Sequence, residues 1–199
     1  MHHFDYRNGR LHAEDVALDA IAEAVGTPFY VYSTATLARH LSVFTEALSG
    51  LNATVCFAMK ANSNLAVLRT LVKLGAGMDV VSGGELALAL KAGCDPDKIV
   101  FSGVGKTAAE LAQALDAGIH QINVESVPEL EALNAIAVAK GLRAPIALRI
   151  NPDVGAGGHE KITTGKKENK FGIDWVDAHG IYQKASAMPG IAVKGIAVH

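Results

Sequence analysis

The sequence has little cysteine, few aromatic residues and almost no net charge. Its 199 residues include two cysteines, one tryptophan and a formal net charge of -2. This balance argues against a DNA- or RNA-binding protein, which needs a basic surface. No apolar run reaches the roughly 18 residues that span a bilayer, and the first residues do not follow the pattern of a signal peptide. We therefore expect a cytoplasmic protein without nucleic-acid or membrane partners.

Cysteine, histidine and glycine spacings exclude several kinds of site. Cys56 and Cys94 lie far apart in the sequence, which suits a reducing compartment better than a disulfide scaffold. The sequence has no Cys-x-x-Cys and no His-Glu-x-x-His, so zinc binding is not predicted. Gly105-Lys106-Thr107 is like the end of a nucleotide-binding P-loop, but Val100 stands where that loop needs a glycine. No Gly-x-Gly-x-x-Gly follows an expected strand, so a dinucleotide site is not predicted either.

What the sequence does contain is an alternation of short β-branched runs with helix-length segments. This alternation predicts βαβ units and a parallel sheet, hence an α/β fold. The repeat length of about 20 to 25 residues fits either a (β/α) barrel or a doubly wound sheet. The six expected strands are Ala53–Ala58, Gly77–Val81, Lys98–Phe101, His120–Val124, Pro145–Ile150 and Ala192–Val198. The five expected helices between them are Asn64–Leu74, Gly84–Ala92, Ala108–Ala117, Val127–Lys140 and Val176–Met188.

The N-terminal part of the chain has a different pattern, typical of a segment that belongs to a second, β-rich domain. Asn8-Gly9 favours a type I′ turn between two short strands. We expect an amphipathic helix over Asp15–Val25 and an aromatic strand over Phe29–Tyr32. Ser33 can then cap a helix over Ala35–Leu48.

The number of expected strands falls short of a closed barrel, which needs eight. The last one runs to His199 with no helix after it, which leaves an open edge and an uncovered face. We therefore expect that the chain is incomplete or that another chain completes it. The predicted division is an N-terminal segment, residues 1–33, and a partial barrel, residues 34–199.

Polar residues stand where the expected strands end, and in barrels the loops at these ends build the active site. Lys60 is the sharpest case, because it follows the apolar run Val55–Met59. On spacing alone it could simply be a snorkelling lysine at a strand end. A Schiff-base lysine, however, needs partial burial to free its amine as a nucleophile, and this position would supply it. The other strand ends carry Asp79, Glu85, Ser102, Asn123, Glu125, Arg149, Asn151 and His199.

These segments resemble one family of barrel enzymes, in the same order along essentially the whole chain. Phe57-Ala58-Met59-Lys60-Ala61-Asn62 resembles the Tyr-Ala-x-Lys-Ala-Asn motif of the alanine-racemase-like barrels, the fold-type III decarboxylases and racemases that use pyridoxal 5′-phosphate. Asp79–Glu85 is similar to the Asp-x-x-Ser-x-Gly-Glu motif of the decarboxylase branch, and Phe101–Thr107 to the third-strand signature. The combination that most resembles the diaminopimelate decarboxylases is Ala147–Pro152, Thr164-Gly165 and Lys170–Gly172. Gly195–His199 resembles the start of the family's Gly-x-His-x-His-Ile-Gly-Ser segment.

Two residues depart from the family pattern. Met59 replaces the usual small β-branched residue before the lysine, which we expect to be a mild change beside the cofactor. Ala197 stands where many members have the first histidine of a pair, so any role of that histidine is lost, whereas the second, His199, is retained.

The resemblance implies a site built around pyridoxal 5′-phosphate. Lys60 is expected to bind the cofactor covalently and later to release product, while His199 stacks on the ring face. Arg149 is expected near the ring's phenolic oxygen or near the active-site carboxylates. Asp79 and Glu85 would organise the lysine and the histidine by hydrogen bonds, although carboxylates at these positions also suit helix N-termini. Three residues of the long loop after the fifth strand are expected at the substrate entrance: His159, Lys161 and Thr164.

The resemblance also implies a reaction and a partner. The expected reaction is the decarboxylation of meso-diaminopimelate to L-lysine and CO2 in lysine biosynthesis. The phosphate-binding loop, the acidic partner of the pyridine nitrogen, the substrate-binding arginine and a C-terminal β-domain shared across a homodimer are all expected beyond His199. Residues 1–199 alone are therefore expected to be inactive.

Three alternatives remain open at this point. Another decarboxylase of the same fold could act on ornithine, arginine or a carboxylated polyamine; a racemase is disfavoured by the second-strand motif and by Lys170-Phe171-Gly172. A non-catalytic PLP-binding barrel protein would lack the N-terminal hairpin. A truncated paralogue could pair with a full-length partner.

Overall fold

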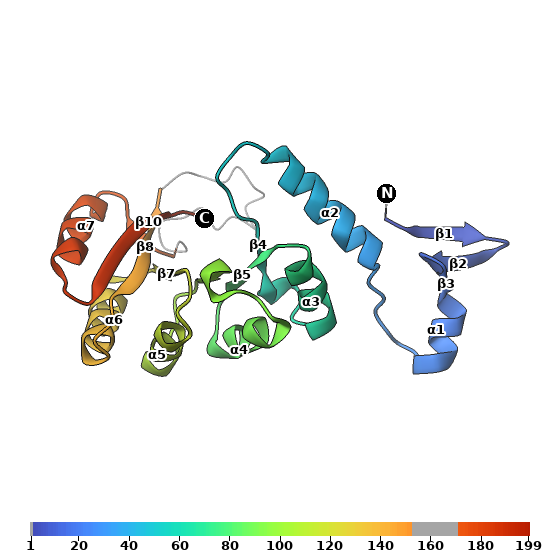
Figure 1. Ribbon diagram of the computed structural model, residues 1–199, viewed down its shortest axis with the longest axis horizontal. Helices are drawn as coiled ribbons and strands as arrows, with labels where there is room; N and C mark the ends of the chain where they lie inside the picture. Colours follow the sequence, from blue (N-terminus) through green and yellow to red (C-terminus); the bar gives the residue numbers. More distant parts are fainter. Residues whose placement is uncertain (1, 153–170) are drawn as a thin grey trace, which may run out of the picture.

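The computed structural model describes residues 2–152 and 171–199, which form a small antiparallel sheet and a larger parallel sheet with helices (Figure 1). None of the helices in this part of the chain is long and apolar enough to cross a membrane. The strands are β1 (Phe4–Arg7), β2 (Arg10–Ala13), β3 (Val16–Ala17), β4 (Cys56–Ala58), β5 (Gly77–Val80), β6 (Ile99–Phe101), β7 (Gln121–Val124), β8 (Ala144–Asn151), β9 (Ile173–Asp174) and β10 (Ile191–Ala197). The α-helices are α1 (Leu18–Val25), α2 (Thr34–Ala47), α3 (Leu65–Lys73), α4 (Gly83–Ala92), α5 (Ala108–Ala117), α6 (Val127–Ala139) and α7 (Ala178–Ala187), with 3-10 turns η1 (Met59–Ala61) and η2 (Pro96–Lys98).

Local sequence signals fix where the helices begin and end, as α5 illustrates. Thr107 and Glu110 form a capping box in which each side chain accepts a hydrogen bond from the other residue's backbone N–H. These N–H groups have no acceptor inside the helix, so the box stabilises its start. Gly118 ends the helix at φ 65°, a left-handed conformation that costs glycine little. The predicted span Ala108–Ala117 is confirmed.

The parallel sheet winds in one direction only. Its order is β10-β8-β7-β6-β5-β4, so each strand lies beside the next one along the chain, apart from the short β9, which pairs with β8. A doubly wound sheet reverses its strand order at a switch point, whereas a barrel does not. The six predicted strands are present, and the winding is that of part of a (β/α) barrel. Strand β9 was not predicted, because two residues carry no periodicity.

The two faces of this sheet differ in chemistry because successive side chains point to opposite sides. One face packs against the helices, and α3 to α6 lie side by side along it (Figure 1). Its strand residues are fully buried and form the core: Met78, Val80, Ile99, Phe101, Ile122, Val124, Ile146 and Leu148. The alternate positions include four half-buried polar side chains: Asp79, Gln121, Asn123 and Arg149. The polar face is therefore the inner wall of the partial barrel.

The N-terminal hairpin forms as predicted, but the segments after it differ. Asn8 and Gly9 have φ values of 51° and 78°, as a type I′ turn requires. The predicted helix over Asp15–Val25 begins only at Leu18, because Val16–Ala17 pairs with β2 as a third strand. In Figure 1 this small sheet and α1 lie at one end of the molecule, beyond α2.

The aromatic strand predicted over Phe29–Tyr32 is wrong. These residues form no strand, and the side chain of Tyr30 is 90% exposed. Strand propensity reflects packing on a pleated, half-buried surface, and this segment instead connects α1 to α2 without a strand partner.

Glu14 joins the N-terminal sheet to the start of α2. Its Oε1 accepts hydrogen bonds from Ser33 Oγ at 2.7 Å and from the backbone N–H of Ala35 at 2.9 Å. Ser33 Oγ in turn accepts from the backbone N–H of Thr36 at 3.0 Å, as its predicted capping role requires. The N–H of Ala35 and the Ser33 hydroxyl hold the pKa of the Glu14 carboxyl below its usual value. The small sheet is thus attached to the helix that leads into the barrel.

Gly77 occupies a position where a side chain has no room. A Cβ atom there would lie 2.4 Å from the backbone oxygen of Lys98 and 2.8 Å from Cys56 Sγ. We expect Gly77→Ala to lower the free energy of unfolding by about 1–3 kcal/mol, the usual cost of overpacking. Urea unfolding of the gene's full-length product measures this change. Gly84→Ala is the matched control, because its Cβ would meet only Ser82 Oγ at 3.8 Å; equal losses in the two variants would contradict the packing explanation.

Candidate active site at the carboxyl ends of the strands

The predicted site residues come from neighbouring parallel strands and therefore meet at one edge of the sheet. Strands that run in the same direction end at the same edge, and the loops that follow them form the active sites of barrels. Ala58, at the end of β4, pairs with Asp79 of β5. At the other end of the sheet, Ala197 of β10 pairs with Arg149 of β8. The site residues are contributed by η1, β5, the turn after β6, β7, β8 and the segment after β10.

Lys60 lies on the 3-10 turn η1, directly after β4, and its side chain is exposed. The expected partial burial of this lysine is therefore wrong for the described structure. The reason is that β4 is an edge strand of the described sheet, with only β5 beside it, and is itself half-buried. The accessible amine stands at the strand end where a cofactor could reach it. Met59, the residue before Lys60, is fully buried in the hydrophobic core.

A chain of hydrogen bonds crosses the inner wall from β5 to β7. Asp79 Oδ1 accepts from Ser102 Oγ at 2.7 Å, and Ser102 Oγ accepts from Asn123 Nδ2 at 3.0 Å. Asn123 Oδ1 accepts from Gln121 Nε2 at 2.9 Å. Asp79 was expected to organise Lys60, but its hydrogen bond in this structure goes to Ser102. Asp79, Ser102 and Asn123 stand at the ends of successive strands in the sequence. This spacing could have predicted that the three side chains contact one another.

Glu85 has a local contact in this structure. Its Oε2 accepts the backbone N–H of Val81 at 2.8 Å, while Ser82 Oγ accepts the backbone N–H of Glu85 at 3.2 Å. These two bonds close the turn between β5 and α4. They match the helix N-terminal interpretation of this carboxylate.

Arg149 is held by a buried carboxylate, Glu125, which directly follows the neighbouring strand β7. Its Nη1 donates to Glu125 Oε2 at 2.8 Å, and the exposed fractions of the two side chains are 17% and 1%. Glu125 Oε1 also accepts the backbone N–H of Gly103 at 2.6 Å. On its other side the Arg149 guanidinium carbon lies 5.8 Å from the centre of the Phe171 ring. One carboxylate thus fixes both the turn after β6 and the arginine of β8.

Lys106, from the motif that is like the end of a P-loop, is fully buried. Its Nζ donates to Glu129 Oε1 at 2.7 Å and to the backbone oxygens of Gly103 and Asn123 at 2.6 and 2.7 Å. The exposed fractions of the Lys106 and Glu129 side chains are 0% and 8%. Burial raises the pKa of the Glu129 carboxyl, and the Lys106 ammonium opposes that shift. This buried ion pair was missed in the sequence, where only the Gly-Lys-Thr pattern was considered.

His199 is exposed and follows β10, on the same edge of the sheet as Arg149. The other expected loop residues, His159, Lys161 and Thr164, lie outside the described residues.

The cysteines do not belong to this site. Burial raises the pKa of the Cys94 thiol to about 11 and also raises that of Cys56. A thiol with a raised pKa is largely protonated near neutral pH, and the thiolate is the nucleophile. Neither cysteine is therefore a candidate nucleophile.

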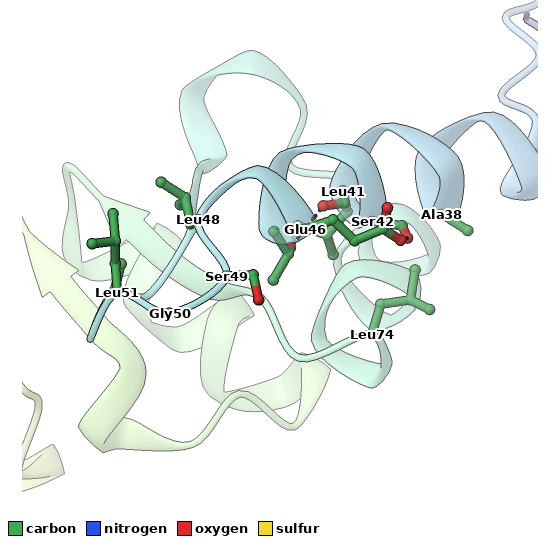
Figure 2. Close-up of a pocket in the computed structure, with 11 residues that line it drawn as sticks. Ala38, Leu41, Ser42, Glu46, Leu48, Ser49, Gly50, Leu51 and Leu74 are labelled. Carbon is green, nitrogen blue, oxygen red and sulfur yellow. Dashed lines mark hydrogen bonds between the residues drawn. The ribbon is translucent and has the colours of Figure 1, made fainter.

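A groove of about 720 Å³ runs along α2 (Figure 2). Its walls include Ala53 and Leu74, which precede β4 and β5, so it lies at the amino ends of the strands. Its carboxylate, Glu46, accepts a hydrogen bond from Ser42 Oγ at 2.6 Å. Catalytic groups of barrels lie at the opposite edge, and we assign no chemistry to this groove.

Comparison with known proteins agrees with this geometry. Residues 34–199 match the family model described as "Pyridoxal-dependent decarboxylase, pyridoxal binding domain". The chain belongs to this family. A diaminopimelate decarboxylase of Pseudomonas fluorescens is 54% identical over 197 residues, which cover 98% of this chain and 47% of that protein. The chain thus spans about half the length of the curated relatives it matches.

Solved structures separate two levels of similarity. The Helicobacter pylori diaminopimelate decarboxylase complexed with L-lysine superimposes with a TM-score of 0.87 at 41% identity, over 92% of this chain and 46% of that one. A lysine/ornithine decarboxylase from Vibrio vulnificus complexed with putrescine has a TM-score of 0.74 at 24% identity, over 92% and 44%. The second likeness is one of fold alone.

The residues present in the pyridoxal-binding domain fit pyridoxal phosphate, the cofactor of this family. The cofactor needs an accessible primary amine, and Lys60 offers one at the strand end. It also needs polar groups with fixed positions around its ring. The inner wall provides them in the Asp79–Ser102–Asn123 chain and in the Arg149–Glu125 pair.

Proposed function

We propose that the gene's full-length product is a carboxy-lyase that converts meso-diaminopimelate to L-lysine and CO2. The observation that carries the proposal is the accessible Lys60 amine at the carboxyl end of β4, in a chain 54% identical to a diaminopimelate decarboxylase. The L-lysine bound to a solved relative of 41% identity is the product of this reaction, and so supports the same substrate.

Lys60 carries the reaction centre in this proposal. Its Nζ amine would hold the cofactor at the carboxyl end of β4. When bound, pyridoxal phosphate supplies an electron sink that accepts the electron pair left behind as the α-carboxylate departs as CO2. The Lys60 amine would remain at the carboxyl end of β4, where it could carry a proton to or from the substrate.

The remaining residues of the inner wall orient the cofactor. Asp79, held by Ser102 Oγ, offers a fixed acceptor on the floor of the site. Arg149, whose guanidinium is held in place by Glu125, would supply a positive charge to the cofactor on the inner wall. His199, which follows the strand beside Arg149, would help to hold the cofactor ring. His159, Lys161 and Thr164 are proposed at the substrate entrance.

The proposal also includes the domain organisation, the oligomeric state and the cellular location of the full-length product. Residues 1–33 belong to a β-domain and residues 34–199 to the cofactor barrel, a division supported by the family match that begins at residue 34. The curated relatives are about twice as long as this chain, so we infer that the phosphate-binding groups come from the other half. We also infer a cytoplasmic homodimer, in line with a biosynthetic enzyme.

The experiment is a substrate comparison with the purified full-length product and added pyridoxal phosphate. CO2 release and the amine product are measured with meso-diaminopimelate, L-ornithine and L-arginine. We expect kcat/KM for meso-diaminopimelate to exceed the others by on the order of 10⁴-fold, because a site that binds polar groups rejects substrates that lack them. Preference for ornithine or arginine would replace the proposed substrate. Cofactor binding without CO2 release from any of the three would favour a non-catalytic barrel protein.

A further inference from the structure

Lys106 is a buried cation with a complete set of acceptors, although it lies behind the site and not in it. Its ammonium group makes three hydrogen bonds of 2.6 to 2.7 Å, to Gly103 O, Asn123 O and Glu129 Oε1. The side chain is 0% exposed, and Nζ lies 5.8 Å from the centre of the Phe101 ring. An ammonium ion with three donors is thereby fully satisfied in the protein interior. Lys106 therefore restrains the positions of its three acceptors.

The groups that Lys106 binds are the ones that hold Glu125. Asn123 O lies two residues before Glu125, and Glu129 Oε2 accepts the backbone N–H of Glu125 at 3.1 Å. Gly103, whose oxygen Lys106 binds, donates its own N–H to Glu125 Oε1. Lys106 therefore restrains the backbone of Glu125 from one side and the partner of its carboxylate from the other.

Among the described residues, the side chain that Glu125 binds is the Arg149 guanidinium, at 2.8 Å. The four charged side chains form two ion pairs, Lys106–Glu129 and Glu125–Arg149, and only Arg149 is more than a tenth exposed. The backbone N–H of Glu125, which Glu129 accepts, joins the two pairs. Buried charges must be paired and hydrogen-bonded, so the position of each depends on the next. The Arg149 end of this series is the end on the inner wall of the barrel.

We propose that Lys106 is a positioning residue that sets the orientation of Arg149 through Glu129 and Glu125. The proposal rests on the proposed function, because it takes Arg149 to face the cofactor. It gives the Gly-Lys-Thr segment a role in this fold that is unrelated to nucleotide binding. A purely structural lysine would stabilise the two turns without any specific link to Arg149.

A double-mutant cycle in the full-length holoenzyme separates these two roles. We expect Lys106→Met to lower kcat/KM by on the order of 10²-fold, as a small misplacement of a positioned group does. In an Arg149→Ala background the same substitution should change kcat/KM by less than about 3-fold, because residues that act through one another are not additive. The same loss in both backgrounds would overturn the proposal. Lys184→Met, which removes an exposed partner of Glu131, is the matched control and should leave activity unchanged.

A second readout does not depend on turnover. The dissociation constant of pyridoxal phosphate and the visible absorption spectrum of the bound cofactor are measured for all four members of the cycle. We expect Lys106→Met to weaken binding and alter the spectrum only when Arg149 is present, with Lys106→Arg closer to wild type. Unchanged binding and spectrum in Lys106→Met would overturn the proposal.

The proposal can still be tested if Lys106→Met does not fold or if the proposed reaction is wrong. If Lys106→Met does not fold, the milder Glu129→Gln replaces it in the same cycle, with the same expected non-additivity and the same contradicting result. If the wild-type protein binds pyridoxal phosphate on Lys60 but decarboxylates no diamino acid, the proposed reaction fails, and the binding and spectral arm still decides the role of Lys106.

Discussion

Lys60→Ala is expected to lower kcat/KM for CO2 release by about 10²–10⁴-fold or more, the range for loss of a positioned proton-transfer group. The same variant should also lose covalent retention of pyridoxal phosphate. Its free energy of unfolding should change by no more than about 0.5 kcal/mol, since the side chain is exposed and the substitution removes no packing. Steady-state assays and urea unfolding of the full-length product measure the two quantities.

Two variants make this expectation specific. Lys60→Arg keeps the positive charge, but a guanidinium stays protonated and cannot serve as the nucleophilic amine, so it should be as inactive as Lys60→Ala. Lys91→Ala removes an exposed lysine from the last turn of α4 and should retain full activity. A Lys60→Arg enzyme with wild-type activity would show that the charge matters and the amine does not.

Glu125→Ala should produce the largest loss of stability among the site variants. The substitution leaves Arg149 without its buried partner and leaves the Gly103 N–H without its acceptor. Removing one member of a buried ion pair costs about 3–5 kcal/mol, because the remaining charge stays uncompensated. Urea unfolding with the cofactor absent isolates this effect from cofactor binding.

Glu131→Ala provides the comparison for Glu125→Ala. Glu131 also pairs with a cation, Lys184, but their side chains are 54% and 44% exposed. Exposed ion pairs contribute about 0–1 kcal/mol, because water solvates both charges in the separated state. If the two substitutions cost the same, burial would not be the reason that the Glu125–Arg149 pair matters.

The barrel elements were predictable because local and tertiary signals agree in them. In α5 the capping box, the apolar periodicity and Gly118 all specify the same helix, and the structure has it at the predicted residues. In the N-terminal part these signals conflict. Phe29–Tyr32 has strong strand propensity but no partner strand, and Val16–Ala17 follows a helical pattern yet pairs with β2. Propensity alone could not decide between these states.

For the site, the sequence predicted which residues gather but not how they bond. Parallel strands bring Asp79 and Arg149 to one edge whatever their side chains do. Their hydrogen bonds to Ser102 and Glu125 depend on register and side-chain rotamers, which no motif records. Lys106 is the clearest case, since its three acceptors come from segments up to 23 residues away.

The central claim is that Lys60 binds the cofactor, and the most direct measurement is borohydride reduction of the full-length product with pyridoxal phosphate, followed by peptide mapping. The account predicts a phosphopyridoxyl group on Lys60 in the peptide that contains Phe57–Asn62. An unmodified Lys60, or a phosphopyridoxyl group on another lysine, would contradict it.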